Sequence, residues 1–213
     1  RHGVFKDSGL TQLVADKLSN AEQIKRAKVF PYQLFSAYKN VDHTVPAKVT
    51  NALQKAAETA IENIPDFGGK VYVFTDVSGS MHSPVTGYRG TVSTKVQCID
   101  VAALVSASVL RKNAEAEVIP FSDHVVRATL NPYDSVMTNA EKLSRLPSGG
   151  TNCSAPLAEL NRRNAKGDLI IYVSDNESWV DSARYRSTAT MTEWNKFKAR
   201  NPKAKLVCID ITP

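Results

Sequence analysis

Hydrophobic residues recur three and four positions apart through the first 65 residues of this 213-residue chain, which is the spacing of amphipathic helices. Asp7 or Ser8 is a suitable N-cap for the first helix and Asn20 for the second, because their side chains accept hydrogen bonds from unpaired backbone N–H groups. Each predicted helix is short and apolar on one side only, so we expect the helices to pack on one another or on a neighbouring domain. The apolar positions are Leu10, Leu13, Val14 and Leu18; Ile24 and Ala27; Leu34, Phe35 and Tyr38; and, after Pro46, the run from Val49 to Ile64.

The pattern changes after the sequence DFGG at residues 66–69, where almost wholly apolar runs begin to alternate with amphipathic segments. Short apolar runs are typical of strands buried on both faces of a parallel sheet. Residues 125–130 closely follow one such strand and are a candidate to pair with it as a hairpin. The alternation predicts an α/β domain over residues 67–213, with a mostly parallel sheet flanked by helices, after a short all-α segment over residues 1–66. We expect strands at 71–75, 117–122, 169–174 and 206–211, and helices at 96–112, 138–146, 156–166 and 191–200.

Composition and charge narrow the class of protein. The chain is 42% hydrophobic and 23% charged, which excludes a wholly disordered protein. No apolar run approaches the roughly 20 residues of a membrane-spanning helix, so no membrane partner is expected. The chain has 27 Lys and Arg against 21 Asp and Glu, a formal charge of +6. The surplus is shared almost equally between residues 1–70 and the remainder, so it permits contact with a polyanion without predicting one.

Three cysteines at positions 98, 153 and 208 are widely spaced and form no C-x-x-C motif, so neither a thiolate zinc site nor a redox pair is indicated. Cys98 and Cys208 lie in apolar runs, where a cysteine usually packs as a small hydrophobic residue. We therefore expect three reduced thiols and a cytoplasmic location.

Oxygen-bearing side chains follow the predicted strands at the points where the strands end. Asp76, Ser78 and Ser80 come directly after the first strand, Thr151 lies in a glycine-containing turn, and Asp175 follows a later strand. Taken singly, each of these residues reads most simply as a helix cap. Ligands of parallel sheets bind beyond the carboxyl ends of the strands, so we expect the five side chains to lie close together. A ligand set of oxygens alone favours a hard cation such as Mg²⁺.

These residues resemble a known site. The sequence DVSGSM at 76–81, the GGT turn at 149–151 and an Asp after an apolar strand are similar to the metal-ion-dependent adhesion site of von Willebrand factor A (vWA) domains. The resemblance covers about residues 67–213 and implies a Rossmann-like vWA fold. It implies that Asp76, Ser78 and Ser80 bind the cation, and that Thr151 and Asp175 complete its shell directly or through water.

Longer motifs of the sequence resemble those of the TROVE/Ro ribonucleoprotein family, in which a ring of HEAT-like helical repeats precedes a vWA domain. The resemblance implies that residues 1–66 are the last repeats, and that the full-length protein binds noncoding Y RNA and misfolded RNA, chiefly through its ring, in RNA quality control. The motifs that carry it are VFPYQLFSAY, FTDVSGSM, GGTNCSAPL and VSDNESW.

Few carboxylates surround the predicted cation, so an open coordination position favours an acidic protein or a phosphate-bearing ligand. The polar run from His82 to Lys95 contains Pro84 and two glycines, which disfavour a helix. Since this run starts beside Ser80, we expect it to pass the cation. Tyr88, Arg89 and Lys95 are then candidate contacts to the partner.

Other interpretations stay open. A vWA subunit of a chaperone-like ATPase assembly would have no role in RNA binding. A metal-dependent hydrolase would need a general base, for which His82 and Glu177 are nearest in sequence; we expect a binding module and not an enzyme. The cluster of Lys25, Arg26 and Lys28 before several aromatic residues could bind RNA, but the sequence favours aromatic residues that pack in a core.

Overall fold

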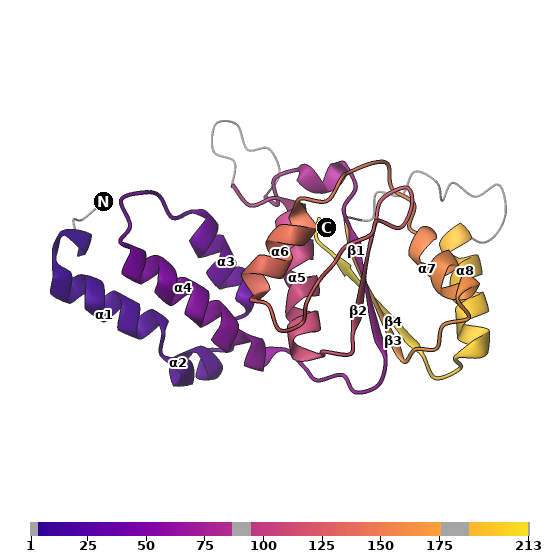
Figure 1. The fold of residues 1–213 in the computed structure, drawn as a ribbon, viewed down its shortest axis with the longest axis horizontal. Helices are drawn as coiled ribbons and strands as arrows, with labels where there is room; N and C mark the ends of the chain where they lie inside the picture. The colour runs from indigo at the N-terminus through magenta and orange to yellow at the C-terminus, as the bar shows by residue number, and fades with distance from the viewer. Residues whose placement is uncertain (1–3, 87–94, 176–187, 213) are drawn as a thin grey trace.

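The computed structural model describes residues 4–86, 95–175 and 188–212, and it places an α/β domain beside a group of four helices (Figure 1). Four parallel strands form one sheet in the order β2-β1-β3-β4. Helices α5 (Cys98–Lys112) and α6 (Val136–Ser144) lie on one side of the sheet, and α7 (Ala155–Arg162) and α8 (Ala189–Arg200) on the other. The predicted α/β class is confirmed. The strands are β1 (Val71–Asp76), β2 (Glu117–Phe121), β3 (Leu169–Ser174) and β4 (Lys205–Asp210).

The central strands are buried on both faces, as their apolar sequences predict. All six residues of β1 are buried. Val71 and Val73 pack with α5, whereas Tyr72 and Phe74 point to the other face and pack with α7 and α8. Alternate residues of a strand point to opposite faces, so a run that is apolar throughout can fill both halves of the core.

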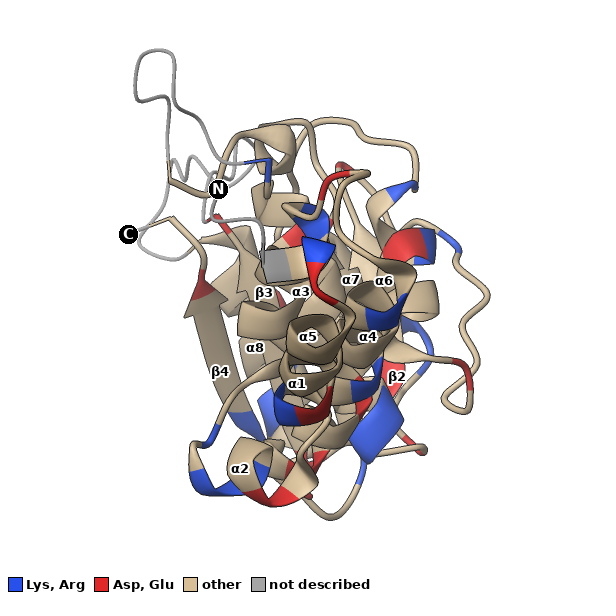
Figure 2. Ribbon diagram, turned by 90° about the vertical axis from the view of Figure 1, so that its left-hand side faces the viewer, with Lys and Arg blue, Asp and Glu red and all other residues tan. Residues whose placement is uncertain are grey.

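The two edge strands differ from the expectation. β4 is largely exposed, with Val207 and Ile209 at 45% and 37% exposure, and Cys208 is exposed instead of packed in the core. The opposite edge of the sheet is β2, on the right of Figure 2. Here the hairpin predicted for residues 125–130 is reduced to one bridge between Phe121 and Val125. Pro120 suits this edge, because proline has no N–H for a further ladder.

The first two helices begin where their caps predict. α1 (Ser8–Leu18) is capped by Asp7, whose Oδ1 accepts a hydrogen bond from Leu10 N at 2.9 Å, and Asn20 caps α2 (Ala21–Arg26) in the same way. α3 (Pro31–Lys39) and α4 (Ala47–Ala60) follow, and 3-10 turns lie at Val4–Lys6 and Ile61–Asn63. The predicted buried face of α1 is wrong at Leu10 and Leu13, which are 45% and 50% exposed, whereas Leu18 packs against a buried cluster that includes Leu53 of α4. α1 instead buries its small residues Thr11 and Ala15.

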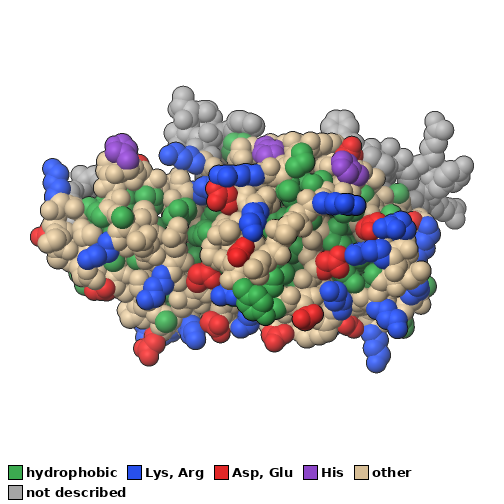
Figure 3. All heavy atoms as spheres, viewed as in Figure 1, with side chains coloured by type: hydrophobic (Ala, Val, Ile, Leu, Met, Phe, Trp, Pro, Cys, Tyr) green, Lys and Arg blue, Asp and Glu red, His purple; other side chains and the backbone are tan. Residues whose placement is uncertain are grey.

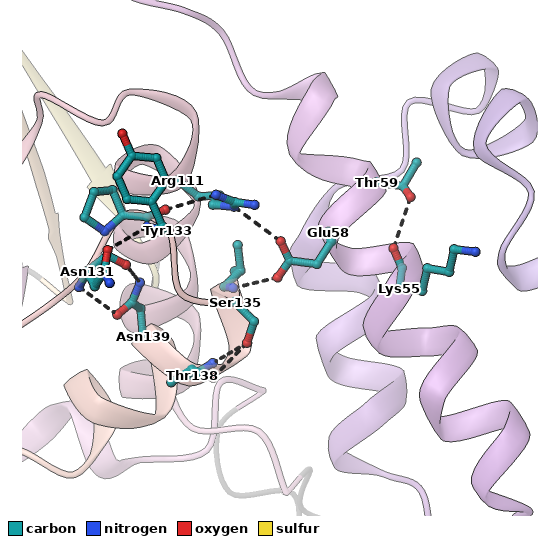
Figure 4. Close-up of polar contacts among 11 residues, drawn as sticks. Lys55, Glu58, Thr59, Arg111, Asn131, Tyr133, Ser135, Thr138 and Asn139 are labelled. Atoms are coloured by element: carbon teal, nitrogen blue, oxygen red, sulfur yellow. Dashed lines mark hydrogen bonds and ion pairs between the residues drawn. The ribbon is translucent and has the colours of Figure 1, made fainter.

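The helical segment packs directly on the α/β domain. Phe35 and Ile61 share a buried cluster with residues of α5 and α6. Glu58 of α4 accepts a hydrogen bond from the backbone N–H of Val136 at 2.7 Å and lies 3.5 Å from Arg111 Nε (Figure 4). A carboxylate at this position stabilises the first turn of α6, because the N–H groups at a helix start carry a partial positive charge.

A second polar contact joins the two parts near the start of α5. Lys39 Nζ of α3 lies 3.1 Å from Asp100 Oδ1, and the Asp100 side chain is only 5% exposed. Asp100 also accepts a hydrogen bond from the backbone N–H of Gln97, just before the helix. Among the helices of the described residues, none combines the length and the apolar character needed to cross a membrane.

Candidate metal-binding site

Asp76 ends β1 and is completely buried. Its Oδ1 accepts a hydrogen bond from Ser78 N at 2.9 Å, and its Oδ2 accepts one from Ser174 Oγ at 2.6 Å. Burial raises the pKa of Asp76 above its ordinary value, and the nearby Asp175 carboxylate raises it further, while the hydrogen bonds from Ser174 and Ser78 lower it. The carboxylate is therefore held in place but remains costly to ionise.

The two serines of the motif turn toward each other directly after β1. Ser78 Oγ lies 3.2 Å from Ser80 Oγ, and Ser78 is buried whereas Ser80 is half-buried. The chain makes this turn in a 3-10 helix over Ser80–His82, which ends at the first residue of the run predicted to be non-helical. Both hydroxyls thus share one small region with the Asp76 carboxylate.

Backbone hydrogen bonds hold the neighbouring loops against this turn. Gly79 N donates to Gly149 O at 2.9 Å, and Val77 N donates to Phe121 O at 2.9 Å. The loop that carries Thr151 is fixed in turn, because Asn152 N donates to Ser122 O at 2.8 Å. These loops meet at the upper end of the sheet in Figure 1, where the strands have their carboxyl ends. Thr151 is 2% exposed within this arrangement.

Asp175 follows β3 and is also buried, at 7% exposure. The backbone holds it in place, since Ile211 N donates to the preceding residue Ser174 and Thr212 Oγ1 lies 3.5 Å from Asp175 O. Asp175 is close enough to Asp76 to disfavour its ionisation. The structure therefore gathers two carboxylates at the carboxyl ends of neighbouring strands.

This arrangement fits a divalent cation. Among the ion pairs of the described residues, none involves Asp76, so no Lys, Arg or His of that part of the chain neutralises it. An unneutralised buried carboxylate is unfavourable unless a cation balances it. Within the described ranges no cluster of three or more His, Cys, Asp or Glu forms a metal site. A cation bound here would depend on hydroxyl oxygens in addition to the two carboxylates.

The sequence profile described as the Ro60 vWA domain matches residues 70–212. The chain belongs to the Ro60 vWA family. It is 24% identical over 218 aligned positions to the "RNA-binding protein RO60" of Deinococcus radiodurans, which covers 97% of this chain and 40% of that protein. It is 24% identical over 177 positions to the "RNA-binding protein RO60" of Caenorhabditis elegans, covering 78% of this chain and 27% of that protein.

The crystal structure of the Deinococcus radiodurans RO (RSR) protein is similar in fold, with a TM-score of 0.74 at 21% identity. The match covers 96% of this chain, so it extends through the helical segment, and 42% of that chain. The chain thus spans about two fifths of the Deinococcus relative. The relatives are named for RNA binding and not for a catalytic activity.

Sequence reasoning missed a polar group in the Ro60 vWA domain beside the Thr151 loop. Asp123 Oδ1 accepts a hydrogen bond from Ser122 Oγ at 3.0 Å and lies 2.6 Å from His124 Nδ1. The hydrogen bond from His124 is the largest cause that lowers the pKa of Asp123. The backbone of this group holds the Thr151 loop through Asn152. The sequence SDH directly after β2 was the available signal, since residues that follow parallel strands lie at the same edge.

The candidate partner-binding residues fall mostly outside the described part of the chain. Tyr88 and Arg89 lie outside the described residues, and Lys95 is exposed. The ends of the run come together, because Pro84 bridges Gln97 and Val85 N donates to Val96 O at 3.0 Å. The chain therefore leaves the turn that carries Ser78 and Ser80 and returns to the start of α5 through a paired stem.

The candidate catalytic bases are not brought together by the described structure. His82 is half-buried at the end of the 3-10 helix, and Glu177 lies outside the described residues. The aromatic residues that follow Lys25, Arg26 and Lys28 differ in burial. Phe35 packs in the core, as the sequence favoured, whereas Phe30 is 50% exposed.

Proposed function

We propose that this chain is part of a Ro-like RNA-binding protein and that its vWA domain binds a partner through a divalent cation, most simply Mg²⁺. The observation that carries the metal proposal is the buried Asp76 carboxylate, which has Asp175 beside it and no cationic side chain to neutralise it among the described ion pairs. The family membership and the relatives' names support the RNA-binding part. Noncoding Y RNA and misfolded RNA are the proposed substrates of the whole protein, in a cytoplasmic quality-control role.

In this proposal the cation is held by Asp76, Ser78 and Ser80, with Thr151 and Asp175 completing the shell. The hard oxygen ligands suit Mg²⁺, and a bound dication supplies a Lewis-acidic position for an oxygen of the partner. Two carboxylates leave no surplus negative charge around a dication, so an acidic side chain or a phosphate is the ligand that this position favours. Tyr88, Arg89 and Lys95 remain proposed contacts to that ligand. The proposed role is binding, not catalysis.

Calorimetric titration with Mg²⁺ tests the metal site directly. Wild type should bind one cation and Asp76→Ala none, while circular dichroism shows that the variant keeps its fold. Asp123→Ala is the matched control, because it removes a carboxylate from the neighbouring loop that is 59% exposed and outside the proposed ligand set. Equal Mg²⁺ affinity in wild type and Asp76→Ala would disprove the site.

The proposed partner chemistry is tested with inorganic phosphate as the probe. Phosphate should bind wild type in Mg²⁺ and lose its affinity in EDTA or in Asp76→Ala, because the cation provides the position that it occupies. Phosphate binding that persists in EDTA would contradict a metal-dependent partner site.

A further inference from the structure

Lys and Arg side chains gather on the face of the molecule formed by α7, α8 and the segment after β2, on the right of Figure 3. This face lies at the opposite end of the molecule from the helical segment (Figure 1). Six exposed basic residues of these elements and their connecting loops form a group that we call the α7–α8 basic surface. It consists of Arg127, Arg162, Arg163, Lys166, Arg200 and Lys203.

Side-chain amides hold the elements of this surface together. Asn161 of α7 donates to Glu193 O of α8 at 2.9 Å and accepts a hydrogen bond from Arg200. Asn201, after α8, donates to Ala165 O at 3.3 Å and accepts from Gly167 N at 3.2 Å. The loop that carries Lys166 is therefore tied to the turn that carries Lys203, so the two cations belong to one surface.

Carboxylates neutralise only part of the charge. Glu159 accepts two hydrogen bonds from Arg162, at 2.8 and 2.7 Å, and lies 3.5 Å from Arg163. Glu117 pairs with Arg163 at 2.8 Å. Arg127 lines the same groove of about 300 Å³ as these groups, beside β2. Glu193 of α8, which also accepts a hydrogen bond from Asn161, pairs with Lys196. Three carboxylates thus lie among the six cations, and the surface keeps a net positive charge.

Helix dipoles do not account for the remaining cations. Arg162 and Arg200 lie in the last turns of α7 and α8, where basic residues balance the partial negative charge of the helix end. Arg127, Lys166 and Lys203 lie outside the helices and, among the described residues, take part in no ion pair. Arg127 is close enough to Glu159 to act on its charge across the groove, whereas Lys166 and Lys203 have no carboxylate partner among the described ion pairs.

We propose that the α7–α8 basic surface binds the phosphodiester backbone of RNA without reading its sequence. The inference rests on the proposed RNA-binding function and assigns it a surface on the vWA domain. Several unpaired cations on rigidly joined elements suit a chain of phosphates better than a single anion. Trp194 of α8 is half-buried, stacks on Phe197 and has Lys198 Nζ 5.9 Å from its ring centroid, so it does not offer a free face to a base.

Fluorescence polarisation with a 12-nucleotide oligouridine and the 213-residue chain tests the proposal. The triple variant Arg127→Gln, Lys166→Gln, Lys203→Gln removes three cations and no described ion pair. We expect it to bind about tenfold more weakly at moderate salt. The slope of log affinity against log salt should become shallower by about 2, as expected for the loss of three phosphate contacts to single-stranded RNA.

The matched control is Lys17→Gln, Lys48→Gln, Lys55→Gln, which removes the same charge from exposed positions of α1 and α4 at the opposite end of the molecule. It should retain affinity and salt slope. Wild-type binding by the first variant, or an equal loss in both variants, would overturn the surface while leaving RNA binding intact. No binding of oligouridine by wild type would overturn RNA binding by this chain as well.

Two further measurements distinguish a loss of RNA contacts from misfolding of the variant and from lipid binding. Melting temperatures within a degree of wild type should show that the first variant is folded, and the pair Lys166→Gln, Lys203→Gln provides a milder second variant. Loss of binding to phosphatidylserine vesicles, with oligouridine binding unchanged, would identify a lipid surface and overturn the RNA assignment.

Discussion

Asp76 is the residue on which the proposed metal site depends most. Its carboxylate is fully buried, accepts hydrogen bonds from Ser78 N and Ser174 Oγ, and lies near the Asp175 carboxylate. Hydrogen bonds orient such a group but only partly offset the free energy lost when its charge leaves water. A buried carboxylate whose ionisation is disfavoured is typical of a functional site.

Replacing Asp76 with Asn should separate metal binding from folding. Burial raises the Asp76 pKa above 3.8, so the metal-free native state keeps its proton to higher pH than the unfolded state does. The free energy of unfolding in EDTA should then fall as pH rises from 3.8 through the raised pKa, and Asp76→Asn should remove this fall. At neutral pH in EDTA the variant should melt at or above the wild-type temperature.

In the presence of Mg²⁺, wild type should melt at a higher temperature than Asp76→Asn. Wild type should gain about 1.4 kcal/mol at a concentration tenfold above its dissociation constant, whereas Asp76→Asn should gain nothing. Asp123→Asn should respond to Mg²⁺ as wild type does. Thermal melts in both buffers measure the difference, and an equal Mg²⁺ response in Asp76→Asn would contradict the assignment.

At the scale of elements, the contact between α4 and α6 joins the helical segment to the vWA domain. Glu58 of α4 accepts a hydrogen bond from Val136 N, in the first turn of α6, and lies beside Arg111 of α5 (Figure 4). Ser135 also caps α6, through Thr138 N at 3.1 Å. The start of α6 is therefore stabilised by its own cap and by a residue 78 positions earlier in the chain.

Glu58→Ala should lower the free energy of unfolding by about 1–2 kcal/mol, because it leaves a helix N–H and Arg111 without their partner. The control is Glu141→Ala, which removes an exposed pair with Arg145 one turn along α6. Such a pair contributes only about 0.3–0.5 kcal/mol. Urea denaturation of the three proteins measures both values, and equal losses would show that the contact between α4 and α6 adds no stability of its own.

At the scale of the whole molecule, the helical segment and the vWA domain share a hydrophobic core. Phe35 of α3 and Ile61 pack against Ala103, Leu104 and Ala107 of α5. The proposed metal site lies at the carboxyl ends of the strands, whereas the α7–α8 basic surface lies on the side face away from the helical segment. The molecule thus offers separate positions for a metal-dependent partner and for RNA.

Because the core is shared, we expect the two parts to unfold together. Thermal melting followed by far-UV circular dichroism and by tryptophan fluorescence should give one coincident transition, since both tryptophans follow residue 70 whereas helices lie in both parts. Phe35→Ala should destabilise the protein by about 3–5 kcal/mol and shift both signals equally. A shift of the circular dichroism signal alone would show that the segment unfolds independently.

Several features followed from the sequence by itself. The apolar run of β1 predicted a strand buried on both faces, and Asp7 and Asn20 predicted the starts of α1 and α2. These features depend on interactions within a few residues, so a local pattern contains the needed information. The order Asp76, Ser78 and Ser80 after β1 also predicted that this loop would lie beside the loops of Thr151 and Asp175, because parallel strands present their ends at one edge.

Only the tertiary structure decided which apolar faces are covered. Leu10 and Val207 have the pattern of core residues and are exposed, because burial depends on a neighbouring element that the local sequence does not encode. The same holds for Glu58, whose role at α6 requires packing between distant segments. The net charge of +6 also gave no position for the α7–α8 basic surface. That surface forms because Asn161 and Asn201 join elements that lie far apart in the chain.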